Sequence, residues 1–166
     1  MVDVKTYAIS CHRDVNQRYQ DKPYEFHLKM VVEIAERFIH LIPEKDREDV
    51  IAGCWVHDVI EDTGKTYNDV KKATNETIAE YAFALTNEKG RNREERANHA
   101  YYSGIDRYKH ATFIKLCDRY ANMKYSKDTG STMFKMYQKE MDSFAWHLKS
   151  HKYEELWTAL ETLANN

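Results

Sequence analysis

Glycine and proline are scarce in this chain. The 166 residues include five Gly and two Pro, so the turns of an all-β fold would lack their usual residues. Helix-favouring residues such as Glu, Lys, Ala and Leu are frequent instead. Hydrophobic residues make up 42% and aromatic residues 13% of the chain, which is enough for one buried core and excludes a disordered protein. We therefore expect a single all-α domain over residues 1–166.

Long hydrophobic runs and an excess of positive charge are also missing. No apolar run approaches the roughly 18 residues that a membrane span needs, and residues 1–5 lack the pattern of a signal peptide. The formal net charge of −2 argues against a broad nucleic-acid surface. Three cysteines without a C-x-x-C pair argue against a disulfide framework. These absences predict a cytoplasmic protein without a membrane or nucleic-acid partner, and they leave the oligomeric state open.

The spacing of apolar residues predicts a helical bundle. Segment 24–40 carries apolar residues at i, i+3 and i+4, Pro43 separates it from the next helix, and segment 66–69 has the pattern of a capping box. The expected helices cover residues 3–14, 24–40, 44 to 57–60, 67–73, 76–85, 93–103, 106–124, 131–149 and 153–164, with polar loops at 16–23 and 86–92. The predicted fold is an all-α bundle of roughly seven to nine helices, whose site must be built from side chains that project between helices.

Acidic residues and a histidine gather at the end of the third expected helix. Segment 57–62 reads HDVIED, and buried carboxylates are costly unless a partner compensates them. A metal ion is the simplest explanation, with His27 and Asp118 on other apolar helices as further ligands. The predicted ligands are His27, His57, Asp58 and Asp118. Two imidazoles and two carboxylates suit Mn, Fe, Zn or Mg and leave positions for water and substrate.

The chain resembles a known family in several segments. The order H…HD…D is the signature of the HD-domain metal-dependent phosphohydrolases. Segment 57–63, HDVIEDT, is similar to the HDxxEDT box of the RelA/SpoT-type branch, which removes the 3′-pyrophosphate of guanosine tetraphosphate (ppGpp). Segments 22–27 (KPYEFH), 114–122 (IKLCDRYAN) and 85–89 (LTNEK) resemble its G-x-P-Y-x-x-H, V-K-L-A-D-x-x-x-N and V-T-D-D-K motifs. The resemblance covers about residues 4–145 and implies an HD-domain helical bundle that hydrolyses ppGpp to GDP and pyrophosphate.

The resemblance also implies a role for each matching residue. His27, His57, Asp58 and Asp118 would bind a divalent ion, usually manganese in this branch, with zinc, iron or magnesium as alternatives. Glu61 and Asp62 match the catalytic pair that positions and deprotonates the attacking water, a task that suits carboxylates beside a metal ligand. The substrate contacts that we expect are Arg18 on the guanine, Asn122 on ribose or phosphate, Lys89 and Arg93 on the pyrophosphate, and Lys135 and Tyr137 around the nucleotide.

Other interpretations fit parts of the same pattern. Another HD-family nucleotide phosphohydrolase, such as a deoxynucleotide monophosphatase, would use the same ligands, although the pair Glu61 and Asp62 favours the alarmone branch. A non-catalytic module that binds metal and nucleotide would show binding without turnover. Cys54 and Cys117 could also join His57 in a softer zinc site. The chain departs from the branch at Tyr19, where a Lys is common, and this departure bears on the base and phosphate contacts.

Overall fold

Helices form nearly all of the regular structure in the computed structural model, which describes residues 3–166. Over these residues nine helices have seven or more residues, so the predicted all-α bundle of seven to nine helices is confirmed. In chain order the α-helices are α1 (Val4–Asp14), α2 (Glu25–Arg37), α3 (Arg47–Val56), α4 (Val59–Thr63), α5 (Tyr67–Ala73), α6 (Glu76–Ala84), α7 (Arg93–Arg96), α8 (His99–Arg107), α9 (Ala111–Asp128), α10 (Met133–Leu148) and α11 (Glu154–Asn165). Short 3-10 turns η1 (Ile39–Leu41) and η2 (Glu44–Asp46) join α2 to α3.

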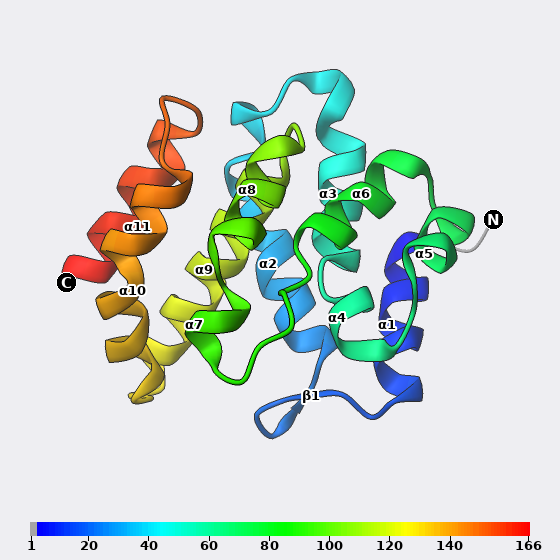
Figure 1. Cartoon of the computed structure of the whole chain (residues 1–166), viewed down its shortest axis with the longest axis horizontal. Helices are drawn as coiled ribbons and strands as arrows, with labels where there is room; N and C mark the ends of the chain where they lie inside the picture. The colour runs from blue at the N-terminus through cyan, green and yellow to red at the C-terminus, as the bar shows by residue number, and fades with distance from the viewer. Residues whose placement is uncertain (1–2) are drawn as a thin grey trace.

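Helix α2 lies at the centre of the bundle and packs against α3 and α9 (Figure 1). Its apolar face, which includes Leu28 and Val31, is fully buried, as are Phe113 and Leu116 on α9. Helices α10 and α11 pack together at the C-terminal end, whereas α1 packs against α3 and α4 at the opposite end of the long axis (Figure 1). In the part of the chain described, no helix is both long enough and apolar enough to span a bilayer.

Local hydrogen bonds explain where the helices end. The capping box predicted at segment 66–69 is present, with Thr66 and Asp69 each bonding to the other's backbone N–H. The expected helix over 93–103 is instead two helices, because the Asn98 side chain caps α8 by accepting a bond of 3.0 Å from the Tyr101 N–H. The expected helix over 106–124 begins later, at Ala111, and continues to Asp128, beyond which Gly130 takes a positive φ of 67°.

The loop expected over residues 16–23 contains a small hairpin. Strand β1 (Arg18–Tyr19) pairs antiparallel with β2 (Lys22–Pro23), and Gln20 in the turn between them adopts a positive φ of 54°. Two-residue strands carry too little alternation to be recognised from a sequence pattern. The hairpin directs Tyr19 toward α2, where its ring stacks on His27 with centroids 4.9 Å apart.

Candidate metal centre

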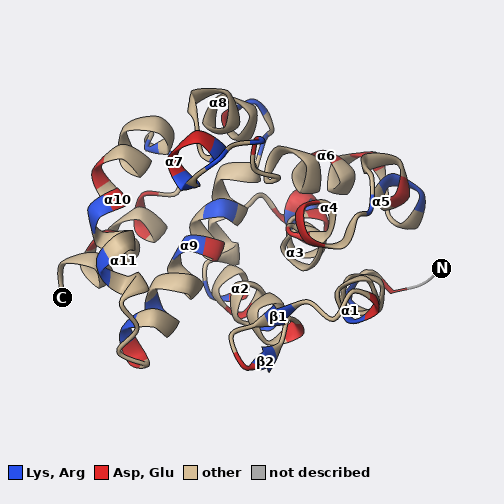
Figure 2. Ribbon diagram, turned by 60° about the horizontal axis from the view of Figure 1, so that its bottom comes forward, with Lys and Arg blue, Asp and Glu red and all other residues tan. Residues whose placement is uncertain are grey.

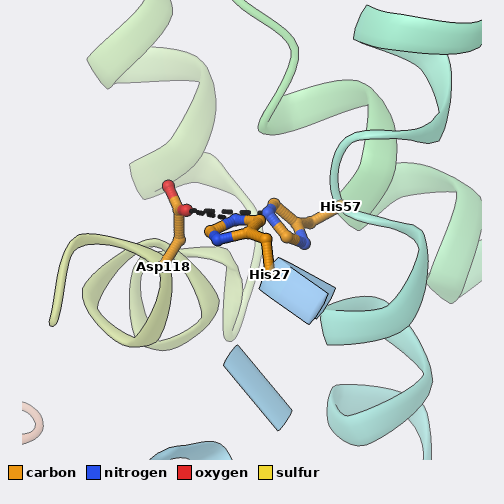
Figure 3. Close-up of side chains that lie close together, drawn as sticks. All are labelled: His27, His57 and Asp118. Carbon is orange, nitrogen blue, oxygen red and sulfur yellow. Dashed lines mark ion pairs between the residues drawn. The ribbon is translucent and has the colours of Figure 1, made fainter. Parts of the chain in front are cut away.

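Three separate parts of the bundle bring the four predicted metal ligands together. His27 lies in the first turn of α2, Asp118 lies on α9, and His57 and Asp58 form the junction between α3 and α4. Figure 3 shows the imidazoles of His27 and His57 directed toward the Asp118 carboxylate. We refer to these four side chains as the metal cluster.

The break between α3 and α4 gives the cluster two consecutive ligands. In a continuous helix neighbouring side chains diverge by about 100°. Here α3 ends at Val56, and Asp58 leaves helical geometry with φ −105° and ψ 1° before α4 begins. As a result, Asp58 Oδ2 lies only 2.8 Å from His57 Nε2. The continuous helix expected up to residues 57–60 is therefore interrupted at the point where the site needs both side chains.

The donor atoms of His27, His57 and Asp118 are spaced as ligands of one ion would be, whereas Asp58 lies beside this group of three. The Nε2 atom of His27 lies 3.1 Å from Asp118 Oδ1 and 3.7 Å from Asp58 Oδ2, and that of His57 lies 3.6 Å from Asp118 Oδ1. Ligands about 2.1 Å from an ion are about 3.0 Å apart at right angles and about 3.4 Å apart in a tetrahedron. His27, His57 and Asp118 form a group that can hold a metal ion, its ligand atoms all within 4.8 Å of one another.

The protonation of His57 also fits a metal ligand. Its Nδ1 lies 2.7 Å from the Cys54 carbonyl oxygen, which can only accept, so Nδ1 carries the proton. The Nε2 atom then faces the carboxylates of Asp58 and Asp118 and makes no hydrogen bond of good geometry, although the side chain is buried. Burial alone would lower the pKa of His57, but Asp58 and Asp118 outweigh it and raise that pKa well above its usual value. The cluster therefore demands a positive charge, which a divalent cation supplies.

Hydrogen bonds from neighbouring side chains orient the carboxylates of the cluster. The Tyr24 hydroxyl donates to Asp58 Oδ2 over 2.6 Å. Lys115 donates to Asp118 Oδ2 and Asn122 donates to Asp118 Oδ1, each over 2.9 Å. Asn122, expected to contact substrate, also accepts a bond of 2.9 Å from the Tyr19 hydroxyl. Such partners tune ligand orientation and affinity; sequence reasoning missed Lys115, although it lies inside the segment that resembles V-K-L-A-D-x-x-x-N.

The predicted catalytic acids lie on α4, one turn beyond the cluster. Glu61 Oε1 accepts a bond of 2.7 Å from the Asn87 backbone N–H. Burial, and then the charge of Asp58, raises the pKa of Glu61, and the same causes together with Glu61 raise the pKa of Asp62 to about 7. A carboxylate with a pKa near 7 can take up and release a proton at neutral pH. The buried side chain of His12 lies next to Asp62, with 3.9 Å between His12 Nε2 and Asp62 Oδ2.

A cavity of about 150 Å³ opens over the cluster, and we call it the metal chamber. Among the predicted substrate contacts, Arg93, Asn122 and Tyr137 line it, as does Glu61. Lys89 lies instead along a separate groove beside α8. Lys135 is exposed on α10, and Arg18 is exposed on the hairpin, where it donates to the Asp21 carbonyl oxygen. Of the six predicted substrate contacts, three therefore line the metal chamber and three lie outside it.

The sulfur atoms do not belong to the same group of ligands. Cys54 and Cys117 are free and fully buried, and burial raises the pKa of both thiols. Over residues 3–166, the group of ligand atoms close enough to share an ion contains His27, His57 and Asp118 and no cysteine. The nitrogen and oxygen set is therefore the one that the geometry supports.

Comparison with known proteins supports the fold. No protein-family profile matches the chain, and no curated protein sequence matches it. Among solved structures it is similar to a metazoan ortholog of SpoT that hydrolyzes ppGpp, with a TM-score of 0.78 and 23% sequence identity. The superposition covers 98% of this chain and 92% of the other. The chain thus has the fold of that SpoT ortholog, as the resemblance in the sequence implied.

Proposed function

We propose that this protein is a metal-dependent phosphohydrolase that converts ppGpp to GDP and pyrophosphate. The observation that carries the proposal is the metal cluster with two acids of raised pKa one turn away, on the fold of a protein described as a ppGpp hydrolase. Glu61 and Asp62 do not stabilise the fold around the cluster, because two negative charges close together repel one another. Their placement is accounted for by proton transfer at the cluster.

Each residue has a task in the proposed reaction. The side chains of His27, His57, Asp58 and Asp118 would hold the ion, which when bound lowers the pKa of a coordinated water and polarises a phosphoryl oxygen. Water attacks the phosphorus attached to the ribose 3′-oxygen, and the bond from that phosphorus to the 3′-oxygen breaks. Glu61 or Asp62 takes the proton from the water, and the 3′-oxygen gains a proton as GDP leaves. Arg93, at the chamber wall, offsets the negative charge that develops on the pyrophosphate.

Manganese is the ion that we propose, with a nucleotide as the bound ligand and the cytoplasm as the compartment. Two imidazoles and two carboxylates suit manganese, although iron, zinc or magnesium can occupy the same donors. The three cysteines are free and buried, as expected for a reducing compartment. One hydrophobic core extends from Ala8 to Ala164, which supports a single domain over the whole sequence.

The first test is hydrolysis of ppGpp by the purified protein with and without added manganese, read out as pyrophosphate release. We expect manganese-dependent turnover that Asp58→Ala and Glu61→Ala each reduce by a factor of at least about 10². Glu76→Ala is the matched control, because Glu76 is exposed on α6 and its side chain bonds to Lys71 alone among residues 3–166. Near-wild-type turnover by either site variant would refute the proposed mechanism. Turnover of deoxynucleotide monophosphates but not of ppGpp would reassign the substrate, and tight binding without turnover would identify a non-catalytic module.

A further inference from the structure

A second and larger cavity adjoins the metal chamber. It has a volume of about 430 Å³ and shares with the metal chamber the lining residues Asn87, Arg93, Tyr101, Lys115 and Arg119. Its other walls come from α7, α8 and α10, and Figure 2 shows both basic and acidic segments on α7, α9 and α10. The lining includes five cations (Arg93, Arg96, Lys115, Arg119 and Lys139) and two carboxylates (Glu94 and Glu140). We call this cavity the basic chamber.

One carboxylate in the basic chamber joins two arginines from different helices. Glu140 Oε1 accepts from Arg93 Nε over 2.5 Å, and Glu140 Oε2 accepts from Arg119 Nη1 over 2.7 Å and from Arg93 Nη2 over 3.2 Å. Burial would raise the pKa of Glu140, but the two guanidinium groups outweigh it and lower that pKa. Glu140 therefore stays ionised and pairs with both arginines, which leaves one net positive charge on the three side chains.

Both arginines also contact aromatic rings, apart from their bonds to Glu140. Arg119 is only 5% exposed, and its guanidinium lies 4.4 Å from the ring centre of Phe144 and 5.0 Å from that of Tyr137. The guanidinium of Arg93 lies over the same Tyr137 ring at 5.5 Å. Aromatic contacts of this kind orient guanidinium groups. Glu140, by contrast, has a side chain that is 30% exposed, so it can turn toward solvent while the arginines remain.

We propose that the basic chamber binds a second phosphate group of the substrate and that Glu140 determines how strongly it does so. The inference rests on the proposed function, in which the substrate carries two diphosphate groups. A carboxylate and a phosphate present similar oxygens to a guanidinium, so Glu140 occupies the donors that a phosphate needs. A phosphate entering the chamber displaces Glu140 from Arg93 and Arg119, and only a ligand of high negative charge competes well with it. Glu140 thereby selects against nucleotides with a single phosphate.

The test is binding of inorganic pyrophosphate to the full chain by isothermal titration calorimetry, on the protein as purified and without added free metal. Glu140→Gln removes the competing charge and keeps the shape of the side chain, so we expect pyrophosphate to bind roughly tenfold more tightly. Glu94→Gln is the matched control, because Glu94 lines the same chamber but no hydrogen bond or ion pair joins it to either arginine among the described residues. That variant is expected to change the affinity by about twofold or less.

The outcomes separate this inference from the proposed function. Arg93→Gln, at a side chain that is 45% exposed, is expected to weaken pyrophosphate binding without loss of the fold. If Glu140→Gln fails to tighten binding, or if Glu94→Gln tightens it equally, the selective role of Glu140 is refuted even when the wild-type protein hydrolyses ppGpp. If the wild-type protein lacks hydrolase activity but Glu140→Gln tightens pyrophosphate binding as expected, the chamber assignment stands and the proposed reaction fails. In an active protein, Glu140→Gln is expected to lower the KM for ppGpp by a similar factor.

Discussion

Replacing Tyr24 with Phe tests whether a neighbouring hydrogen bond tunes the metal cluster. The change removes one hydroxyl, which donates to Asp58 Oδ2 over 2.6 Å, and keeps the ring that stacks on His12 with centroids 4.6 Å apart. Without that bond the Asp58 carboxylate is freer to turn away from the other ligands. Loss of such an orienting partner typically weakens metal binding 10- to 100-fold, or about 1.4–2.7 kcal/mol.

The assay is competition for manganese between the protein and a chelating dye, followed by thermal unfolding of the metal-free form. Tyr67→Phe is the matched control, since it also removes a hydroxyl bound to a carboxylate, with 2.9 Å between Tyr67 and Glu80 Oε1, and neither residue lines the metal chamber. We expect the control to leave manganese affinity within about twofold of wild type, because only contacts at the cluster tune it. If Tyr24→Phe binds manganese as tightly as the control does, the hydroxyl does not hold Asp58 in place for the ion.

Three further perturbations follow from the structure. A Cβ at Gly53 would lie 2.7 Å from Ile114 Cδ1, whereas one at Gly104 meets nothing within 4 Å; chemical denaturation should therefore show Gly53→Ala less stable than Gly104→Ala by about 1–3 kcal/mol, and equal stability would contradict the close approach. Burial and the charge of Asp58 raise the pKa of Asp62 in the folded, metal-free protein to about 7, whereas the pKa of an Asp in the unfolded chain is about 3.9. The folded state therefore keeps a proton that the unfolded state releases, and the free energy of unfolding falls as the pH rises from about 4 to 7. Asp62→Asn should reduce that fall, measured as a smaller difference in Tm between pH 5 and pH 7.5, and an unchanged difference would show that Asp62 is not the group responsible. Removal of manganese by a chelator should lower Tm by an amount that grows with the logarithm of the ion's affinity, equivalent to about 2.7 kcal/mol when free ion stands at 100 times Kd. A Tm that does not depend on the ion would argue against binding at the cluster.

The helices could be predicted because their apolar periodicity is local. Segment 24–40 shows the pattern of α2, and the Thr66 and Asp69 side chains cap α5 where the pattern of a capping box predicts it. The division at Asn98 was missed because an asparagine inside an apolar pattern caps a helix only when its side chain reaches the backbone three residues ahead. The hairpin at residues 18–23 was missed because its two-residue strands have no period.

At the candidate site, too, some residues could be predicted from the sequence and others could not. The motifs pointed to His27, His57, Asp58 and Asp118, and the structure brings the four together. Pairs such as Arg119 with Glu140 join α9 to α10 through side-chain packing, and no spacing in the sequence carries that information. Lys89 was expected at the pyrophosphate and Lys135 around the nucleotide, but neither residue lines the metal chamber.

The metal cluster draws its ligands from α2, from the α3–α4 junction and from α9, which are far apart along the chain. An ion held there acts as a cross-link that closes two long loops at once, and long loops carry the larger closure entropy. The ligands can meet only after α9 has packed against α2, so the complete site cannot exist in a chain that has folded only its first half. Capture of the ion is therefore expected late in folding.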